Sequence, residues 1–326
     1  METLLASELP AEGGEIALKG KRYVMRDGIL RSHSSHSATQ AQTQGTYAYL
    51  WSKLELEGDA RSFQEAWFEQ HFPGWRAEVS KLAPAGSRVL DAGCGAGWSA
   101  LAFFGEHLRN VAYIGADIST ALERAAENFR NMAMPGNFVQ ESLTQLPFSP
   151  ASFDFIFTPG VLHHTDSVKT SLKQLAELLV PGGKLLLWVY RKQPPLREFA
   201  DRLIRNHLAK LTDEEAFRDL MPLTRLGDAL GRLNVDVDVP EDIPVLGIPK
   251  GRINLQRLVY YYFVKTFYND SLSLERANMQ NFDWYRPLNA HTSTLEEVQQ
   301  WCALAGLTVE WHLTTPSGIS ALARKK

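Results

Sequence analysis

The chain of 326 residues has very few cysteines, no long apolar run and almost no excess charge of either sign. Its two cysteines, Cys94 and Cys302, exclude a disulfide scaffold and a four-thiolate zinc site. A bilayer-spanning helix needs about 20 consecutive apolar residues, and no stretch comes near that length. The 34 Lys and Arg against 37 Asp and Glu give a net charge of −3, which removes the usual electrostatic footprint of a general nucleic-acid binder.

The first residues of the chain also lack a targeting signal. They contain no basic segment, and Glu2 and Glu8 interrupt any apolar run, so a secretory signal is excluded. We therefore expect a cytoplasmic protein with no transmembrane segment. The sequence leaves a homo-oligomer open.

Short apolar runs alternate with helix-like segments in the first two thirds of the chain. Continuous apolar strands separated by helices are typical of a parallel sheet that is covered on both faces. The pattern therefore predicts an α/β, doubly wound, mostly parallel sheet. We expect strands at 88–91, 111–117, 137–141, 153–158 and 184–190, and helices at 99–107, 119–132 and 168–180, with Ser119 as the N-cap of the second.

The remaining segments predict three parts. Residues 1–60 read as an N-terminal segment and linker, a candidate lid for a cofactor. Within them 32–46 are almost all small or polar, which predicts a linker or a loop that orders on ligand. Residues 61–191 and 292–326 form the core, whose last helix and two closing strands are expected at 294–305, 307–311 and 319–324. Residues 192–291 form a largely helical insertion, and so long an insertion is typical of a substrate cap.

Three glycines follow the first predicted strand of the core and precede a helix. Gly93, Gly95 and Gly97 let the backbone pass close to a ligand without a Cβ in the way. A dinucleotide-binding loop needs glycine at its first, third and sixth positions, but the sixth position counted from Gly93 is Trp98. A tryptophan there obstructs the close packing of helix on strand. The loop therefore favours a ligand with an amino-acid end and no phosphate.

Polar side chains lie at the ends of four predicted strands: Asp91, Asp117, Glu141 and Thr158. Ligands of doubly wound sheets bind outside the carboxyl ends of the strands. Asp117 lies twenty residues after Gly97, where an acid is placed to accept hydrogen bonds from ribose hydroxyls. These residues indicate one binding site at this edge of the sheet.

Five segments of the chain stand in a specific order and spacing: VLDAGCGAGW (89–98), IGADIS (114–119), LPFSPASFDFIF (146–157), GVLHHT (160–165) and LVPGGKLLLWVY (179–190). They resemble the class I S-adenosylmethionine-dependent methyltransferases over about residues 86–191. Within that class the chain is similar to the type 11 set, which includes the ubiquinone/menaquinone C-methyltransferases. The resemblance implies a seven-stranded Rossmann-like sheet and an enzyme that converts S-adenosylmethionine to S-adenosylhomocysteine.

The resemblance also implies which residues contact this cofactor. Asp117 would bind the ribose and Ile118 would lie against the adenine. The family usually has Gly-Asp before the Leu-Pro-Phe, and its acid reaches the adenine amino group. This chain has Glu141-Ser142 there, and Ser142 cannot supply that carboxylate, which leaves Glu141 for the contact. The loop around the methionine part would consist of Asp91, Gly93, Cys94, Gly95 and Gly97, and the floor beside the methyl group of Thr158, Pro159 and Gly160.

Candidate catalytic residues follow from the chemistry of methyl transfer. Positioning supplies much of the acceleration, and an acceptor that loses a proton also needs a general base. The candidates for that base are His164, Tyr190 and Asp283. His163 and His164 have no third ligand at metal-binding spacing, so we expect no metal.

The expected class of acceptor follows mainly from the sequence motifs that the chain lacks. Methyltransferases that act on base amino groups usually have Asn/Asp-Pro-Pro-aromatic after the fourth strand, where this chain has Thr-Pro-Gly-Val (158–161). Neither cysteine is placed as the nucleophile of a pyrimidine C5 enzyme. We expect a small-molecule acceptor methylated at O, N or C, and no nucleic acid. The alternatives are a nucleotide-binding dehydrogenase, a non-catalytic interaction protein that keeps the fold, and a group transferase that uses a derivative of the cofactor.

Overall fold

The computed structural model describes residues 9–32, 36–53 and 59–326, so the expectation of no signal sequence at 1–8 lies outside the described residues. The chain divides into two compact units, Met1–Arg191 with Ser293–Lys326, and Lys192–Thr292. Each unit is described by itself. No helix among the described residues is long and apolar enough to cross a membrane.

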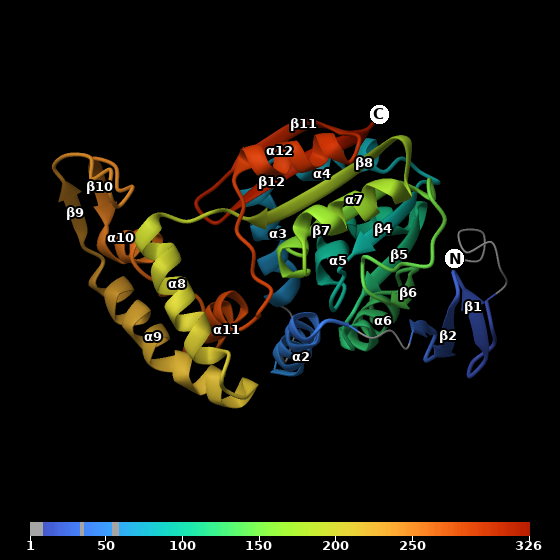
Figure 1. Ribbon diagram of the computed structural model, residues 1–326, viewed down its shortest axis with the longest axis horizontal. Helices are drawn as coiled ribbons and strands as arrows, with labels where there is room; N and C mark the ends of the chain where they lie inside the picture. Colours follow the sequence, from blue (N-terminus) through green and yellow to red (C-terminus); the bar gives the residue numbers. More distant parts are fainter. Residues whose placement is uncertain (1–8, 33–35, 54–58) are drawn as a thin grey trace. The chain divides into compact units, whose positions relative to one another are not determined.

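One sheet forms the centre of the first unit, and among the described residues it has ten strands in the order β1-β2-β3-β6-β5-β4-β7-β8-β12-β11 (Figure 1). The strands from β6 to β8 are parallel, and β12 and β11 follow antiparallel. These seven match the predicted doubly wound sheet. The strands of the unit are β1 (Glu15–Leu18), β2 (Lys21–Arg26), β3 (Ile29–Ser32), β4 (Arg88–Ala92), β5 (Ala112–Asp117), β6 (Asn137–Gln140), β7 (Phe153–Pro159), β8 (Leu179–Tyr190), β11 (Leu307–Thr314) and β12 (Gly318–Lys325).

The expected count of seven strands was incomplete, because three N-terminal strands extend the sheet. β1, β2 and β3 form an antiparallel meander, and β3 pairs in parallel with β6. Pairing with β3 covers the edge that β6 would otherwise expose, and an unpaired edge strand is a site for aggregation. The N-terminal residues are therefore part of the sheet of the first unit.

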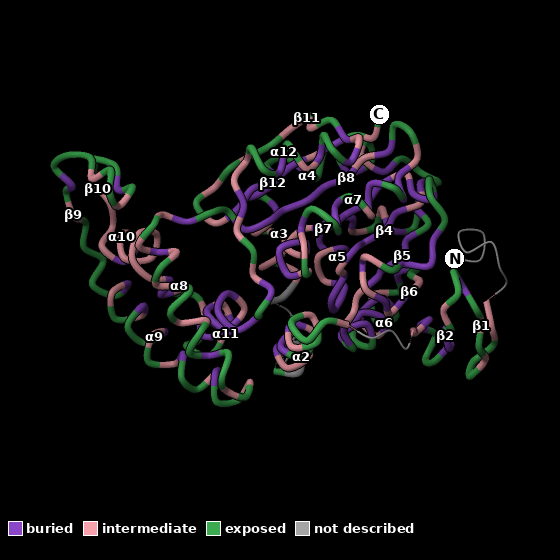
Figure 2. Tube along the Cα trace, viewed as in Figure 1, coloured by how far each residue is buried: buried purple, intermediate pink, exposed green. Residues whose placement is uncertain are grey.

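The central strands are buried on both faces, as their continuous apolar sequence predicts (Figure 2). Leu90, Ile114 and Ile156 on three neighbouring strands are fully buried. Helices cover the sheet, and in Figure 1 α7 lies close to β7 and β8. The helices of this unit are α2 (Ala38–Lys53), α3 (Asp59–His71), α4 (Trp75–Leu82), α5 (Trp98–Phe104), α6 (Ala121–Asn131), α7 (Val168–Leu178) and α12 (Leu295–Leu304), with the 3₁₀ helices η1 (Gly105–Asn110) and η2 (Leu162–His164).

The stretch 32–46 was predicted to be a linker, and this prediction was wrong over the described part, because α2 begins at Ala38. Its small polar residues do not form a clear apolar face. Thr43 and Thr46 are nevertheless buried, with 1% and 0% of their surface exposed. Contacts with the rest of the unit, rather than the propensity of the segment, therefore stabilise this helix.

The second unit is largely helical and contains a two-stranded sheet that the sequence did not indicate. Its longest helix is α9, which begins with a capping box between Thr212 and Glu215. The bounds are α8 (Pro195–Leu208), α9 (Asp213–Leu233), β9 (Asp236–Val239), β10 (Gly251–Asn254), α10 (Leu255–Tyr262) and α11 (Leu274–Tyr285). A function of this unit as a substrate cap stays a prediction.

Candidate active site

The glycine loop connects β4 to α5 at the carboxyl edge of the sheet. Gly93, Gly95 and Gly97 all have positive φ angles, of 88°, 51° and 80°. A Cβ on Gly93 would lie 2.2 Å from Cγ1 of Val161, so any larger residue would displace the loop. The backbone amide of Gly93 donates to the carbonyl of Ala116 on β5 (2.7 Å), which holds the loop close to the neighbouring strand.

Trp98 is the first residue of α5 and is half-buried. Gly97 precedes it, and a Cβ on Gly97 would lie 2.9 Å from the ring of Phe129 on α6. The Asn128 side chain of α6 donates to the carbonyl of Ala96 (2.9 Å). The loop is therefore fixed from both neighbouring elements before any ligand binds.

Asp91 lies on β4 beneath the loop, with 1% of its surface exposed. The hydroxyl of Tyr113 on β5 donates to its Oδ2 (2.8 Å). Burial raises the pKa of the Asp91 carboxyl to about 7, the hydrogen bond from Tyr113 opposes that rise, and the charge of Asp117 adds to it. Among the described residues Tyr113 is the one side-chain donor to this carboxylate, which leaves Oδ1 for a ligand.

Asp117 ends β5 and is half-buried. Its Oδ2 accepts from the amide of Gly95 (2.9 Å), and its Oδ1 accepts from the amide and the hydroxyl of Ser119 (2.8 and 2.7 Å). Burial raises the pKa of Asp117, and these donors oppose the rise. The prediction that Ser119 caps α6 was wrong: the helix begins after Thr120, and the Ser119 hydroxyl is used to orient Asp117.

Ile118 follows Asp117 and presents its carbonyl to two glutamine side chains. Nε2 of Gln44 on α2 donates to it (2.8 Å), and Nε2 of Gln140 on β6 donates to it as well (3.2 Å). The Gln140 amide oxygen in turn accepts from Arg31 on β3 (2.9 Å). N-terminal elements therefore reach the edge where the resemblance places adenine.

Glu141 follows β6 and is fully engaged by other residues. Its Oε2 accepts from the hydroxyl of Tyr23 (3.0 Å) and pairs with Lys21 Nζ (3.3 Å), and its Oε1 accepts from the amide of Ser142 (2.7 Å). The Ser142 hydroxyl lies 3.1 Å from that of Thr144. A contact of Glu141 with adenine stays a prediction, and it would require these partners to be exchanged.

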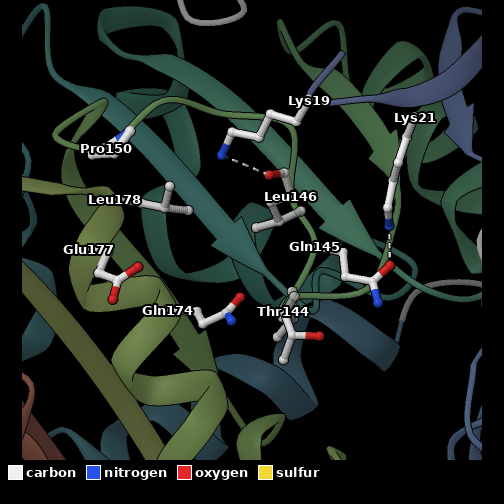
Figure 3. A pocket seen from close by; sticks show the side chains of 10 residues that line it. Lys19, Lys21, Thr144, Gln145, Leu146, Pro150, Gln174, Glu177 and Leu178 are labelled. Atoms are coloured by element: carbon white, nitrogen blue, oxygen red, sulfur yellow. Dashed lines mark hydrogen bonds between the residues drawn. The ribbon is translucent and has the colours of Figure 1, made fainter. Parts of the chain in front are cut away.

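The same N-terminal strands border a hollow of ≈ 250 Å³ (Figure 3). Lys19 donates to the carbonyl of Leu146 (3.3 Å), and Lys21 donates to the side chain of Gln145. None of the predicted site residues lines this hollow. We interpret it as the seam where the N-terminal strands attach to the loop after β6.

The end of β7 provides a polar floor next to the glycine loop. Thr158 is fully buried, and its hydroxyl donates to the carbonyl of Ala92 (2.9 Å), which ties β7 to β4. Pro159 is half-buried and ends the strand. Gly160 has a φ of 82°, and a Cβ there would meet no atom of the described residues within 4 Å, so these residues leave open space at this position.

Two of the three candidate bases lie together beside this floor. The rings of His164 and Tyr190 have centroids 5.3 Å apart, and His164 is 5.1 Å from the ring of Tyr47 on α2. His163 stacks on Tyr190 at 3.7 Å. Asp283 lies on α11 of the second unit, where its charge raises the pKa of Lys265 against the effect of burial. That Tyr47 joins this cluster was not predicted.

The arrangement fits S-adenosylmethionine better than a dinucleotide. Asp91 and Asp117 flank the glycine loop, and two carboxylates suit the ammonium group and the ribose hydroxyls of this cofactor. They would repel a pyrophosphate, because like charges at short range are unfavourable. The described residues contain no group of three or more His, Cys, Asp or Glu that could hold a metal ion.

Sequence reasoning missed the residues that support the predicted ones. Tyr113 is a phenol in an otherwise aliphatic strand, and a buried phenol usually has a hydrogen-bond partner, so this signal was available. Gln44 and Arg31 gave no such signal, because their roles depend on where α2 and β3 pack.

Comparison with known proteins finds one matching family and several similar proteins. Residues 90–187 match the family described as "Methyltransferase domain". The chain is similar to the tRNA U34 carboxymethyltransferase of Methylococcus capsulatus (32% identical over 114 residues, 35% of each chain). It is also similar to the uncharacterized methyltransferase YcgJ of Bacillus subtilis (33% identical over 136 residues, 40% of this chain and 51% of the relative).

Among solved structures, the magnesium protoporphyrin IX methyltransferase of Synechocystis PCC 6803 with bound S-adenosylhomocysteine aligns with 88% of this chain and 98% of its own. It does so at 13% identity and a TM-score of 0.48. The chain spans about a third to a half of the length of the curated relatives it matches. The glycine loop and all the predicted cofactor contacts lie inside the matched domain. Residues 90–187 of the chain therefore correspond to a methyltransferase domain.

Proposed function

We propose that the chain transfers the methyl group of S-adenosylmethionine to an O, N or C atom of a small molecule. The observation that carries the acceptor class is the position of α2 over the carboxyl edge of the sheet. Gln44 donates to the carbonyl of Ile118 (2.8 Å), and Gln40 donates to the carbonyl of His164 (3.3 Å). A site that is covered by a helix can enclose a small acceptor, so it favours such an acceptor and disfavours a polymer.

Residues at the start of α2 add further contacts to this edge of the sheet. The hydroxyls of Ser37 and Thr39 both donate to Asp166 Oδ1 (2.8 and 3.0 Å). The bonds of α2 therefore run from the end of β5 to the segment after β7. We infer that residues 37–47 act as the lid over the cofactor, and that the lid must open for cofactor exchange.

The residues of this chain have separate tasks in the proposed reaction. When bound, the cofactor supplies a methyl group on a sulfonium, which leaves as a thioether. Asp117 would hold the ribose, the loop from Asp91 to Gly97 would hold the amino-acid end, and Thr158 with Pro159 would shape the floor. Most of the acceleration would come from holding donor and acceptor in line and away from water.

An acceptor hydroxyl or acidic carbon also has to lose a proton. We propose His164 as the residue that accepts it, because its ring lies in the aromatic cluster beside the open position at Gly160. Tyr190 packs against the same ring and would orient it. Asp283 stays a prediction as an alternative base, and so do a cytoplasmic location and a homo-oligomer.

A nucleic-acid acceptor is the second candidate, and one observation favours it. The relative from Methylococcus capsulatus carries the name tRNA U34 carboxymethyltransferase, so this relative is named for a tRNA acceptor and for a transferred group other than methyl. The net charge of −3 does not support a large phosphate-binding surface.

The test is the transfer of radiolabelled methyl from S-adenosylmethionine into two separate fractions of a cell extract. One fraction contains metabolites below about 1 kDa and the other contains purified RNA. We expect label in the small-molecule fraction, lost with Asp117→Ala and strongly reduced with His164→Ala. Label only in the RNA fraction, sensitive to ribonuclease, would establish the tRNA-type acceptor instead. No label in either fraction, from protein that binds S-adenosylhomocysteine, would favour the non-catalytic alternative.

A further inference from the structure

Four ionisable side chains meet beneath the glycine loop: Asp91, Cys94, Tyr113 and Asp117. Asp91, Cys94 and Tyr113 are buried, with 1%, 5% and 2% of their surface exposed. The register of the sheet explains how they come together. Asp91 pairs with Gly115, and Val89 pairs with Tyr113, so the Tyr113 ring points along the same face toward Asp91.

Gly115 makes this arrangement possible. A Cβ on Gly115 would lie 2.9 Å from Cys94 Sγ and 3.0 Å from the ring of Phe138. The missing side chain therefore gives space to the Cys94 thiol and to the Phe138 ring. The Tyr113 ring is held from the other side by Phe129, stacked at 4.9 Å. The hydroxyl has little freedom to leave Asp91.

The chemistry of the group is that of a carboxylate with one fixed donor and one open acceptor. Tyr113 donates to Oδ2 of Asp91 (2.8 Å), and a hydrogen bond to the charged form of a carboxyl favours that form. The charge of Asp117, which lies on the same strand as Tyr113, raises the pKa of Asp91. Cys94 in the loop is a thiol whose pKa burial raises well above its usual value, so it stays neutral.

We propose that Tyr113 is a positioning residue for the cofactor: its hydroxyl holds the buried Asp91 carboxylate in the orientation and charge that receive the ammonium group of the amino-acid end. This inference rests on the proposed function, because it assumes S-adenosylmethionine as the ligand. It goes beyond that function by making a residue outside the binding loop responsible for how cofactor affinity depends on pH.

The consequence is a proton linked to binding. Burial raises the pKa of Asp91 to about 7 in the chain without ligand, so this carboxyl keeps its proton to a higher pH than an exposed aspartate does. A ligand ammonium requires the carboxylate, so binding releases that proton and affinity increases as pH rises through 7. Without the Tyr113 hydroxyl the carboxyl is harder to ionise, and the increase moves to higher pH.

The experiment is a calorimetric titration with S-adenosylhomocysteine, which has the same ammonium group, between pH 5.5 and 8.5. The proteins are wild type, Tyr113→Phe, Asp91→Asn and Tyr23→Phe. Tyr23→Phe is the matched control, because Tyr23 is also a buried phenol that donates to a buried carboxylate, Glu141 (3.0 Å), on a different strand. Thermal unfolding checks that every variant is folded.

We expect the midpoint of the affinity–pH curve to move upward by about one to two pH units in Tyr113→Phe, the effect of losing one hydrogen bond to a charged group. Binding at pH 7 becomes roughly fivefold weaker or more, and it recovers toward the wild-type value at high pH. Asp91→Asn binds weakly with a flat curve, and Tyr23→Phe follows wild type.

Two results overturn the inference while leaving the proposed function intact. One is a Tyr113→Phe curve with the wild-type midpoint, even if affinity falls equally at every pH, because that would be a purely structural effect. The other is an equal shift in Tyr23→Phe. Wild-type protein that binds no S-adenosylhomocysteine at any pH would overturn the proposed function and this inference together.

Discussion

The two units of the chain each bury a cluster of ionisable side chains, and the clusters differ in how completely they are paired. In the first unit Asp91 accepts a hydrogen bond from one side chain of the described residues, Tyr113, and lies beneath a glycine loop at the edge of the sheet. In the second unit Asp201 accepts from Arg197 through Oδ1 (2.8 Å) and from the indole of Trp284 through Oδ2 (2.9 Å). One cluster is open to a ligand and the other is closed on itself.

The closed cluster is organised around one aromatic ring. Lys265, Arg197 and Arg205 lie 4.7, 5.2 and 5.4 Å from the ring centroid of Trp284, each within the range of a cation–π interaction. Lys265 Nζ also donates to the carbonyl of Gln280 (2.9 Å). Every cation in this cluster has a partner within the unit, which is typical of a group that specifies a fold.

The difference shows how a buried charge can be assigned to structure or to function. Arg197 is 2% exposed and its partners are all within the second unit, so it contributes to the folding of that unit. Asp91 is equally buried, but it lies at the carboxyl end of a strand beside left-handed glycines. Position and incomplete pairing, rather than burial alone, indicate the binding site.

The largest expected effect comes from breaking the closed cluster. Asp201→Ala leaves the buried Arg197 guanidinium without its carboxylate, which we expect to lower the free energy of unfolding by about 3–5 kcal/mol. Urea unfolding measures it. Asp228→Ala is the matched control, since Asp228 and Arg232 form an Arg–Asp pair at the same i,i+4 spacing on the surface of α9. Equal effects in the two variants would contradict the structural assignment of the buried pair.

The next effect is on folding stability, which we expect to depend on pH in opposite directions through the two clusters. Burial lowers the pKa of Lys265 from 10.5 to about 7, so between these values the unfolded chain holds a proton that the folded chain lacks. Stability therefore rises with pH from 7 to about 10, at up to about 1.4 kcal/mol per pH unit. We expect Lys265→Met to flatten this slope in unfolding experiments over that range. An unchanged slope would mean that Lys265 is not the responsible group.

The Asp91 carboxyl should change folding stability in the opposite direction and over a lower pH range. Its pKa is raised from 3.8 to about 7, so the folded chain holds the extra proton between these values and its contribution to stability falls as pH rises. Asp91→Asn should remove that decrease between pH 4 and 7 and leave the Lys265 slope above pH 7 unchanged. A variant that altered both slopes would show that the two clusters are not independent.

A smaller effect is expected on cofactor affinity at the open cluster. Asp117→Ala removes one or two hydrogen bonds to a charged group, at about 1.5–3 kcal/mol each, so S-adenosylhomocysteine should bind at least roughly tenfold more weakly. Calorimetric titration measures the dissociation constant. The unfolding free energy should change much less than in Asp201→Ala. An unchanged dissociation constant would exclude Asp117 as the ribose ligand.

The smallest effect is expected at the lid. Gln44→Ala removes one neutral hydrogen bond between α2 and Ile118, which corresponds to about a twofold to tenfold weaker binding of S-adenosylhomocysteine and a faster dissociation. Stopped-flow displacement measures the rate. Ala41→Ser, on the exposed side of the same helix, should leave both unchanged. The lid proposal fails if Gln44→Ala behaves like this control.

The local sequence predicts the core of this fold because its signals are local. The apolar runs that become β4, β5, β7 and β8 are continuous, and the glycines of the loop are spaced for a turn between strand and helix. The resemblance then added the expected seven-stranded sheet and the cofactor. The positions of Asp117 and Thr158 at strand ends follow directly from the ends of the apolar runs.

The elements that were missed depend on contacts between distant segments. α2 is stabilised by packing that buries Thr43 and Thr46, which no local pattern indicates. The pairing of β3 with β6 joins residues more than a hundred positions apart. The bond between Tyr113 and Asp91 depends on the register of β4 on β5, which cannot be read from one segment alone.

The central claim is that the glycine loop with Asp91 and Asp117 is built for S-adenosylmethionine. Calorimetric titration of the wild-type protein with S-adenosylhomocysteine, and with NAD as the control ligand, tests it most directly. We predict one site with a dissociation constant on the order of micromolar, about 8 kcal/mol of binding free energy, and no heat from NAD. Binding of NAD, or of neither ligand by folded protein, would contradict the claim.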